Sequence, residues 1–250
     1  MDTTTIERLN SINREFYRVT VQNFDESRGR FWPGWKQLMA LPLVTALTQQ
    51  HMADGNALRV LDLGCGNGRF GRFLGKHFAL PVDYHGLDNN ATLLERASED
   101  LSGYPSLSVT LDLRDIVTDP PDKGVYDLVV LFGVVHHLPG AEYRQNLLGQ
   151  LAERVDQGGV FVFTAWCFYE YERFREKIVP WPSELEHEQG DYLMDWRRGH
   201  EANSILRYCH YVDEAEQTRL TAATQLTEIA SFRADGHTND INRYSVLWRS

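Results

Sequence analysis

The stretch Val60-Leu-Asp-Leu-Gly-Cys-Gly-Asn-Gly-Arg-Phe70 decides the fold of this chain, because an apolar run ends in an acid and three alternating glycines. The pattern predicts a buried strand, a tight turn and the first turn of a helix. Gly64, Gly66 and Gly68 allow positive φ angles and leave no Cβ between the backbone and a ligand. We therefore expect a ligand-binding turn, with Cys65 inside it, at the carboxyl end of the strand.

The ligand that this turn favours carries a positive charge. A dinucleotide-binding turn would need Gly-x-Gly-x-x-Gly, whereas here Arg69 follows Gly68 and the spacing is Gly-x-Gly-x-Gly. Asp62 stands at the lip of the turn, where a carboxylate repels phosphate and attracts a cation. The motif therefore favours a ligand with an ammonium or sulfonium group over a pyrophosphate.

Length and composition restrict the class of protein. The chain has 250 residues, of which 42% are hydrophobic, enough for one α/β domain with an elaboration. No apolar segment approaches the ~20 residues that span a bilayer, and the first residues lack the pattern of a signal peptide. The 3 cysteines lie far apart, which argues against a disulfide framework or a zinc site. We expect a cytoplasmic protein without a membrane segment or a metal.

The formal net charge of −10 removes any broad electrostatic case for nucleic-acid binding. A local basic patch stays open, because arginines cluster between Arg8 and Arg30 and again at Arg197 and Arg198. Acidic residues interleave with the first cluster, so solvated helix faces would explain it equally well.

Strands and helices alternate along most of the chain. Residues 4 to about 22 are expected to form an amphipathic helix with a capping box at Thr4 and Glu7, and a second helical region after Trp32 is interrupted by Pro42. The alternation that follows predicts right-handed crossovers and a doubly wound, mostly parallel sheet. The expected strands are 58–63, 82–87, 106–112, 125–132 and 160–165, with helices 67–77, 90–102 and 140–155 between them, and helix 213–223 precedes strands near 226–232 and 242–249.

The pattern breaks after the fifth strand. Residues 166–211 are rich in aromatic residues and contain the stiff Pro180-Trp-Pro182, which is unusual for a crossover. We expect an insertion that packs over the ligand edge of the sheet, although a satellite core would have the same composition. The expected division is an N-terminal helical cap at 1–52, a ligand-binding domain at 53–165 and 212–250, and a substrate-cap insertion at 166–211.

Acids follow the second and third strands, where ligands of parallel sheets bind. Asp88 ends the second strand, where a carboxylate can accept both hydroxyls of a ribose, while Asn89 or Asn90 is available to cap the next helix. Asp112 and Leu113 end the third strand and are expected to meet an adenine. Two further acids in this loop are alternatives to Asp112, namely Asp115 and Asp119.

The fourth strand runs into Phe132-Gly-Val-Val-His-His-Leu-Pro139. Gly133 lets the chain leave the sheet close to a ligand, and His136 and His137 follow at the edge where chemistry would occur. Adjacent histidines lack metal-ligand spacing, and one packed and one exposed histidine would be an ordinary helix-entry loop.

These motifs together resemble the class I S-adenosylmethionine-dependent methyltransferases. The resemblance covers residues 57–165 and depends on Asp62-Leu-Gly-Cys-Gly-Asn-Gly68, on Asp88, and on Asp127-Leu-Val-Val followed by His136-His137-Leu. It implies a Rossmann-like sheet of seven strands whose last strand is antiparallel. It also implies that Asp62 lies near the cofactor ammonium and that Asp88 holds the ribose.

A narrower resemblance lies outside that core. Tyr17...Phe24-Asp-Glu-Ser-Arg28...Phe31-Trp-Pro33 and Arg207-Tyr-Cys-His-Tyr211 are similar to segments of the tRNA wobble-uridine carboxymethyl methyltransferases. This resemblance implies that Tyr17 and Arg28 close over the cofactor and that Arg207 and His210 face the acceptor. The residues expected to bind the cofactor are Tyr17, Arg28, Asp62, Gly64, Cys65, Gly66, Gly68, Asp88, Asn89, Asp112, Leu113, Phe132 and His137, and those expected to be catalytic are Arg207, His210 and His136.

The expected function is methyl transfer from S-adenosylmethionine, either to a carboxymethyl group on tRNA wobble uridine or to a small molecule at oxygen or nitrogen. A carboxylate acceptor is already ionised at neutral pH and needs a cation such as Arg207 or Arg28 to orient it. A phenol, amine or hydroxyl would instead need a histidine base. A non-catalytic cofactor-binding or partner subunit is the alternative outside enzymes, and the sequence says nothing about a protein partner.

Overall fold

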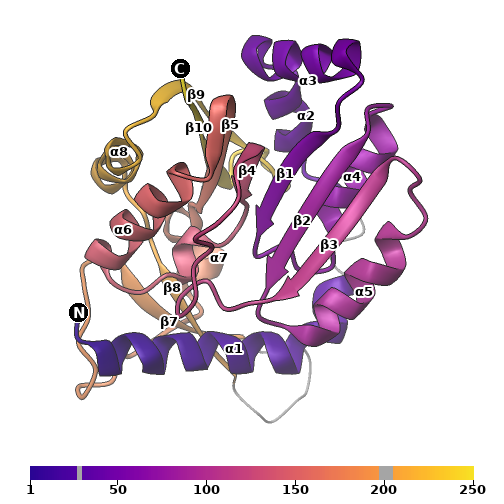
Figure 1. Ribbon diagram of the computed structural model, residues 1–250. Helices are drawn as coiled ribbons and strands as arrows, with labels where there is room; N and C mark the ends of the chain where they lie inside the picture. The colour runs from indigo at the N-terminus through magenta and orange to yellow at the C-terminus, as the bar shows by residue number, and fades with distance from the viewer. Residues whose placement is uncertain (27–29, 197–204) are drawn as a thin grey trace.

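The fold is built around a seven-stranded sheet with the strand order β3-β2-β1-β4-β5-β10-β9 (Figure 1). A computed structural model describes residues 1–26, 30–196 and 205–250, and only the backbone of 21–26. The first five strands are parallel, and β10 runs antiparallel between β5 and β9, which confirms the predicted doubly wound, mostly parallel sheet. The strands are β1 (Leu58–Leu63), β2 (Val82–Asp88), β3 (Leu107–Leu113), β4 (Tyr126–Leu131), β5 (Val155–Trp166), β9 (Thr227–Ala234) and β10 (Asn242–Trp248).

Helices cover both faces of this sheet and enclose two hydrophobic cores. One core joins α2, α3, α4 and α5 to the sheet, and the other joins α6 and α8 to the opposite face. The central strands contribute side chains to both cores. In β4, Leu128 and Val130 lie in the first core, and Val129 and Leu131 lie in the second core. The helices are α2 (Pro33–Met39), α3 (Pro42–Asp54), α4 (Arg69–His77), α5 (Ala91–Leu101), the short η1 (Val135–His137), α6 (Ala141–Ala152) and α8 (Glu214–Ala223).

The first helix, α1 (Thr3–Glu26), lies across the edge of the sheet where the parallel strands end (Figure 1). Its start differs from the predicted capping box at Thr4 and Glu7. The Asp2 carboxylate accepts hydrogen bonds from the Thr5 backbone N–H at 2.7 Å and from its hydroxyl at 2.9 Å, so Asp2 caps the helix. Within the part of the chain that is described, no helix is both long and apolar enough to cross a membrane.

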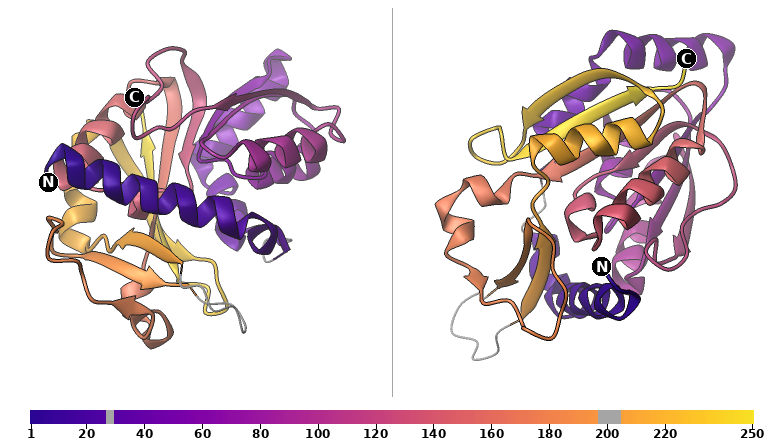
Figure 2. Two further views of the ribbon diagram at one scale, coloured as in Figure 1. Left: turned by 90° about the horizontal axis from the view of Figure 1, so that it is seen from below. Right: turned by 90° about the vertical axis from the view of Figure 1, so that its left-hand side faces the viewer.

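The segment after β5 forms a second, three-stranded sheet with the order β6-β7-β8. This sheet lies beside α1 (Figure 2), and the Tyr208 backbone N–H donates to Asn13 Oδ1 of α1 at 2.9 Å. Leu9 of α1 packs on Tyr208 in a small core between them. The elements of this segment are η2 (Phe168–Glu170), α7 (Glu172–Arg175), β6 (Ile178–Val179), β7 (Asp191–Asp195) and β8 (Leu206–His210).

One predicted boundary differs by more than the usual fraying of ends. The helix expected at 140–155 ends at Ala152, and β5 begins at Val155 instead of residue 160. The reason is an irregularity at the glycine pair: Gly158 adopts a φ of +79° inside the strand, and the register with β4 shifts between Tyr126 and Leu128.

Candidate functional site

A cleft of about 1040 Å³, part of it open to solvent, lies at the carboxyl ends of β1, β2 and β4. Its floor is the glycine turn after β1, and α1 contributes Asn10, Asn13 and Tyr17 to its wall. The parallel sheet explains the position of the cleft, because the loops after its strands all emerge at this edge.

The glycine turn depends on the absence of side chains. Gly64 adopts a φ of +70°, and a Cβ there would meet Val134 Cγ2 at 2.4 Å. Gly66 and Cys65, both predicted to bind the cofactor, line the cleft. Gly68 serves the packing of the turn instead, since it precedes α4 with a φ of +71° and a Cβ would meet Leu101 at 2.9 Å.

Asp62 is a buried carboxyl group at the end of β1 that lines the cleft. It is 2% exposed and accepts a hydrogen bond of 2.5 Å from the Tyr84 hydroxyl. Burial, with a smaller contribution from the neighbouring Asp88 carboxylate, raises the pKa of Asp62 to about 7. The hydrogen bond from Tyr84 offsets only part of the cost of burying an ionised Asp62, so a cationic ligand would stabilise the ionised form.

Asp88 lies beside the same turn at the end of β2. Its two oxygens accept hydrogen bonds from the Gly66 N–H at 2.8 Å and from the Asn90 N–H at 2.9 Å. Asn90 caps α5 by accepting from the Leu93 N–H at 3.1 Å, which leaves Asp88 and Asn89 facing the cleft. Burial raises the pKa of Asp88 to about 6, so at pH 7 this carboxyl group is still mostly ionised and makes its side of the cleft electronegative.

The residues predicted after the third strand need correction. Asp112 accepts a hydrogen bond from His85 Nε2 at 2.8 Å, and Leu113 is 64% exposed, while Asp115 and Ile116 line the cleft instead. The strand continues to residue 113, one residue beyond its predicted end, and the chain then turns inward. Asp115, which the sequence offered as an alternative, accepts from Asn10 Nδ2 of α1 at 2.9 Å.

An aromatic wall faces the two acids. Phe132, predicted to bind the cofactor, lines the cleft together with Trp32 and Trp35, whose rings are stacked with centroids 5.4 Å apart. The Arg69 guanidinium lies over Trp32 at 5.1 Å, and burial lowers the pKa of Arg69 to about 10. Gly133 permits this arrangement, because a Cβ there would meet the Trp32 ring at 3.3 Å.

His137 faces the cleft with a defined tautomer. Its Nδ1 lies 3.0 Å from the carbonyl oxygen of Tyr208, which can only accept, so Nδ1 carries the proton. Its Nε2 is therefore an acceptor, and it lies 2.8 Å from the Tyr17 hydroxyl and 2.7 Å from Arg207 Nη2. Tyr17 and His137, both predicted to bind the cofactor, line the cleft.

Arg207 lies directly behind this pair of residues. It is 7% exposed, donates to the Tyr17 hydroxyl at 2.8 Å, and lies 5.1 Å from the centre of the Trp166 ring. No carboxylate of the described residues forms an ion pair with it. His136, expected to be catalytic, is 3% exposed and packs between His137 and Trp166, so His137 is the histidine at the cleft.

His210 is in a structural network and not at the cleft, which corrects its predicted catalytic role. Its ring nitrogens lie 2.7 Å from Asp191 Oδ1 and 2.6 Å from Glu216 Oε2. The Arg144 guanidinium bonds Glu216 at 2.7 Å and lies 3.0 Å from the Nε2 of His210. Glu188, Asp191 and His210 have the spacing of a metal site, but Glu188 is already paired with Arg144, and Asp191 is already bonded to His210.

Arg28, predicted to close over the cofactor, lies outside the described residues. The sequence prediction missed Asn10 and Asn13, which line the cleft from α1. The sequence does contain a signal for them. Asn10, Asn13 and Tyr17 recur at helical spacing, so their polar groups are expected on one face of the N-terminal helix.

Comparisons with known proteins agree with this geometry. Residues 61–161 match the model of a family described as a methyltransferase domain. The chain is 24% identical over 175 residues to a probable tRNA methyltransferase 9B of Bos taurus, covering 68% of this chain and 33% of that one. It is 25% identical over 129 residues to a chloroplastic tocopherol O-methyltransferase of Arabidopsis thaliana, covering 51% and 35%. The chain thus spans about a third of the length of these curated relatives.

A solved structure shares the fold over nearly the whole chain. It is an amino pentose methyltransferase from Micromonospora echinaspora with bound S-adenosylmethionine. The TM-score is 0.55 with 19% identity, and the match covers 92% of this chain and 97% of that one. At this identity the likeness concerns the fold.

Proposed function

The chain belongs to the class I S-adenosylmethionine-dependent methyltransferases, and on this premise we propose that it methylates a carboxylate, with the carboxymethyl group of a tRNA wobble uridine as the first candidate acceptor. S-adenosylmethionine is the cofactor of this family. The chemistry of the cleft fits such a ligand, because buried Asp62 and Asp88 suit a cation with hydroxyl donors and the aromatic wall suits a base.

In this proposal the two acids divide the cofactor between them. Asp62 binds the ammonium group, and Asp88 uses its remaining lone pairs to accept from the ribose hydroxyls. Trp32, Phe132 and Ile116 form apolar surface that excludes water from the reacting end of the cleft. When bound, the cofactor supplies a methyl group already activated on a sulfonium, so the protein acts mainly by positioning.

The observation that carries the acceptor proposal is the buried guanidinium of Arg207. A buried charge without an ionic partner is costly, and a carboxylate entering beside Tyr17 and His137 would relieve that cost. The His137 Nε2 is held by donors from Tyr17 and Arg207, which leaves it poorly placed to take a proton from an acceptor. This arrangement favours an acceptor that needs orientation over one that needs a base.

The runner-up is methylation of a small molecule at oxygen or nitrogen. The net charge of −10 favours it, and a tocopherol O-methyltransferase is among the relatives at 25% identity. A cofactor-binding subunit without catalysis is a third reading. Calorimetry with S-adenosylmethionine and transfer assays together separate these three functions.

The deciding experiment is transfer of tritiated methyl from S-adenosylmethionine onto total tRNA, beside a panel of small carboxylic acids, amines and phenols. We expect label in tRNA that mild alkali releases, because a methyl ester hydrolyses there. Loss of one charged hydrogen bond of about 1.5–3 kcal/mol in Arg207→Met would lower kcat/KM for the acceptor roughly 10- to 150-fold. Arg207→Lys, which keeps the charge, should retain more activity, and both should bind cofactor like the parent. Label in amines or phenols alone would overturn the carboxylate proposal.

A further inference from the structure

A second hollow, of about 970 Å³ and open to solvent, lies next to the cofactor cleft. Four cationic side chains line it, namely Arg30, Lys36, Arg72 and Lys76. We call these four residues, with the rings of Phe31, Trp32 and Tyr104 between them, the basic hollow. It is formed by α2, the residues before it, α4 and the turn after α5.

The positive charge of the basic hollow is only slightly compensated. Arg72 pairs with Asp100 at 2.9 Å, whereas Arg30, Lys36 and Lys76 form no ion pair with any carboxylate of the described chain. The adjacent His77 senses this field, since partial burial and then the charges of Lys36 and Lys76 lower its pKa. Such a concentration of cations stands out in a chain with a net charge of −10.

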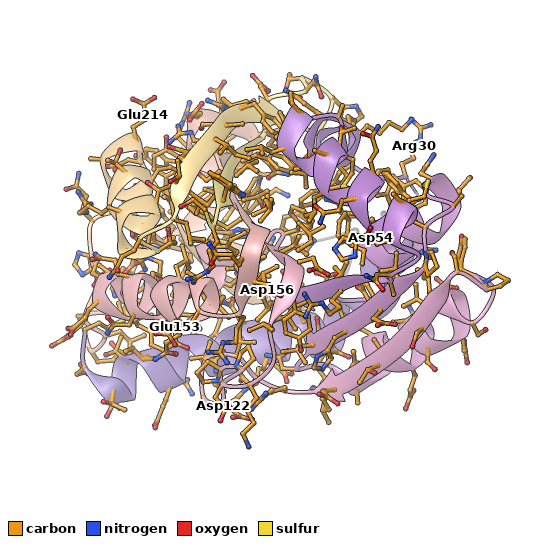
Figure 3. All side chains as sticks on the ribbon, turned by 45° about the horizontal axis from the view of Figure 1, so that its top comes forward. Arg30, Asp54, Asp122, Glu153, Asp156 and Glu214 are labelled. Carbon is orange, nitrogen blue, oxygen red and sulfur yellow. The ribbon has the colours of Figure 1, made fainter. Side chains whose placement is uncertain are left out.

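The basic hollow is continuous with the cleft through one side chain. Trp32 lines both, and on its cleft side it contacts Trp35 and Arg69. Arg30 extends outward beside the N-terminal helices, on the other side of the molecule from the acidic Glu214 (Figure 3). A ligand too large for the cleft could therefore place its reacting end inside and its body over the basic hollow.

We propose that the basic hollow binds the phosphate backbone of an RNA acceptor. The inference rests on the proposed function and names the surface that holds the body of the acceptor. Phe31, Trp32 and Tyr104 are partly exposed. Cations placed around such aromatic rings are the arrangement that binds single-stranded RNA, because the cations contact phosphates and the rings stack on bases. An acidic peptide would use the cations alone and leave the rings of Phe31 and Tyr104 without a role.

The same hollow explains how an acidic chain binds a polyanion. Repulsion from a net charge of −10 acts over a Debye length of roughly 10 Å at 0.1 M salt, so a cluster in direct contact with phosphate outweighs distant acids. A negative net charge is therefore compatible with RNA binding, because the positive charges are concentrated on one surface.

The test is a titration of labelled total tRNA and of a synthetic anticodon stem-loop by fluorescence anisotropy, between about 50 and 200 mM salt. The test variant is Lys36→Glu with Lys76→Glu, and the matched control is Lys123→Glu with Arg219→Glu, which makes the same charge change at exposed positions elsewhere. Removing two phosphate contacts should weaken binding about 25- to 60-fold near 0.1 M salt and lower the salt slope by about 1.4 to 1.8. The control should stay within about threefold of the parent chain.

Cofactor affinity measured by calorimetry shows whether each variant is folded, because neither lysine lines the cleft. Equal RNA affinity in the two double variants would overturn the proposal that the basic hollow binds RNA. If the parent chain and both double variants still methylate tRNA, the proposed function survives that result. Absence of RNA binding by the parent chain, together with methylation of a small acid, overturns both the RNA surface and the tRNA acceptor. Selective loss in the Lys36→Glu, Lys76→Glu protein supports the inference.

Discussion

Asp62→Asn should remove most of the pH dependence of cofactor binding. We propose that the ionised Asp62 binds the cofactor ammonium, and burial raises its pKa to about 7. Below that pH the carboxyl group is protonated, and the charge that attracts the ammonium is lost. Asparagine keeps the shape of the side chain but stays neutral at every pH.

The size of the effect follows from the two acids in the cleft. With a pKa of about 7, the ionised fraction of Asp62 rises from about 3% at pH 5.5 to about half at pH 7, a gain of about 16-fold in affinity. Asp88, with a pKa of about 6, adds about fourfold over the same range. Between pH 5.5 and pH 7 the cofactor affinity of the parent chain should therefore rise by the product of both factors. The affinity of Asp62→Asn should rise only by the factor that Asp88 contributes. At pH 7 the variant should also bind roughly 10- to 150-fold more weakly.

Isothermal calorimetry with S-adenosylmethionine at pH 5.5, 6, 6.5 and 7 measures these slopes. Tyr84→Phe is the matched control, because it removes the hydrogen bond that favours the ionised Asp62 and should move the transition to higher pH. Unfolding by urea provides a check of the fold. Because the carboxyl pKa is raised by folding, the contribution of Asp62 to stability is fully present below the ordinary carboxyl pKa of 3.8 and is lost as the pH rises through about 7. Asp62→Asn should therefore be at least as stable as the parent at pH 7.5. Equal pH slopes in the parent and Asp62→Asn would refute the role of Asp62.

Two further predictions test the corrected residues. Arg144→Met leaves the carboxylates around His210 buried without the Arg144 guanidinium. It should therefore lower the free energy of unfolding, measured by urea titration, by about 3–5 kcal/mol. A loss below about 1 kcal/mol would contradict the structural role of this network. Asp112→Asn should leave the cofactor Kd within about twofold, because its carboxylate is bonded to His85 outside the cleft, whereas Asp115→Asn should weaken binding about tenfold. The opposite ranking in calorimetry would restore the original prediction for the third strand.

The sheet and the cofactor side of the cleft were predictable because their signals are local. The apolar run of β1, the glycines after it and the acid after β2 each lie within a few residues of the group they position. The end of β3 was mispredicted by one residue for a physical reason. This strand is at the edge of the sheet and most of its side chains are at least partly exposed, so no burial pattern marked where it stops.

The residues expected to face the acceptor were harder to predict, because the residues that they contact are distant in the chain. The Arg-Tyr-Cys-His run leads us to predict Arg207 and His210 as a pair facing the acceptor, but the two residues are three apart on β8, and alternation along a strand places them on opposite faces. Arg207 meets Tyr17 of α1, whereas His210 meets Glu216 and Arg144, which lie on α8 and α6. No spacing within the motif indicates those partners.

The two halves of the site consequently depend on different parts of the fold. The acids that suit the cofactor are fixed by the central sheet, through hydrogen bonds such as that from Gly66 to Asp88. The proposed acceptor group is fixed by contacts between α1 and β8, with the partners Tyr17 and Arg207 lying 190 residues apart. Because α1 and β8 meet outside the main sheet, substitutions there can alter the acceptor side while the cofactor turn keeps its geometry. In our proposal the choice of acceptor therefore depends on α1, the second sheet and the basic hollow, whereas the glycine turn carries no information about it.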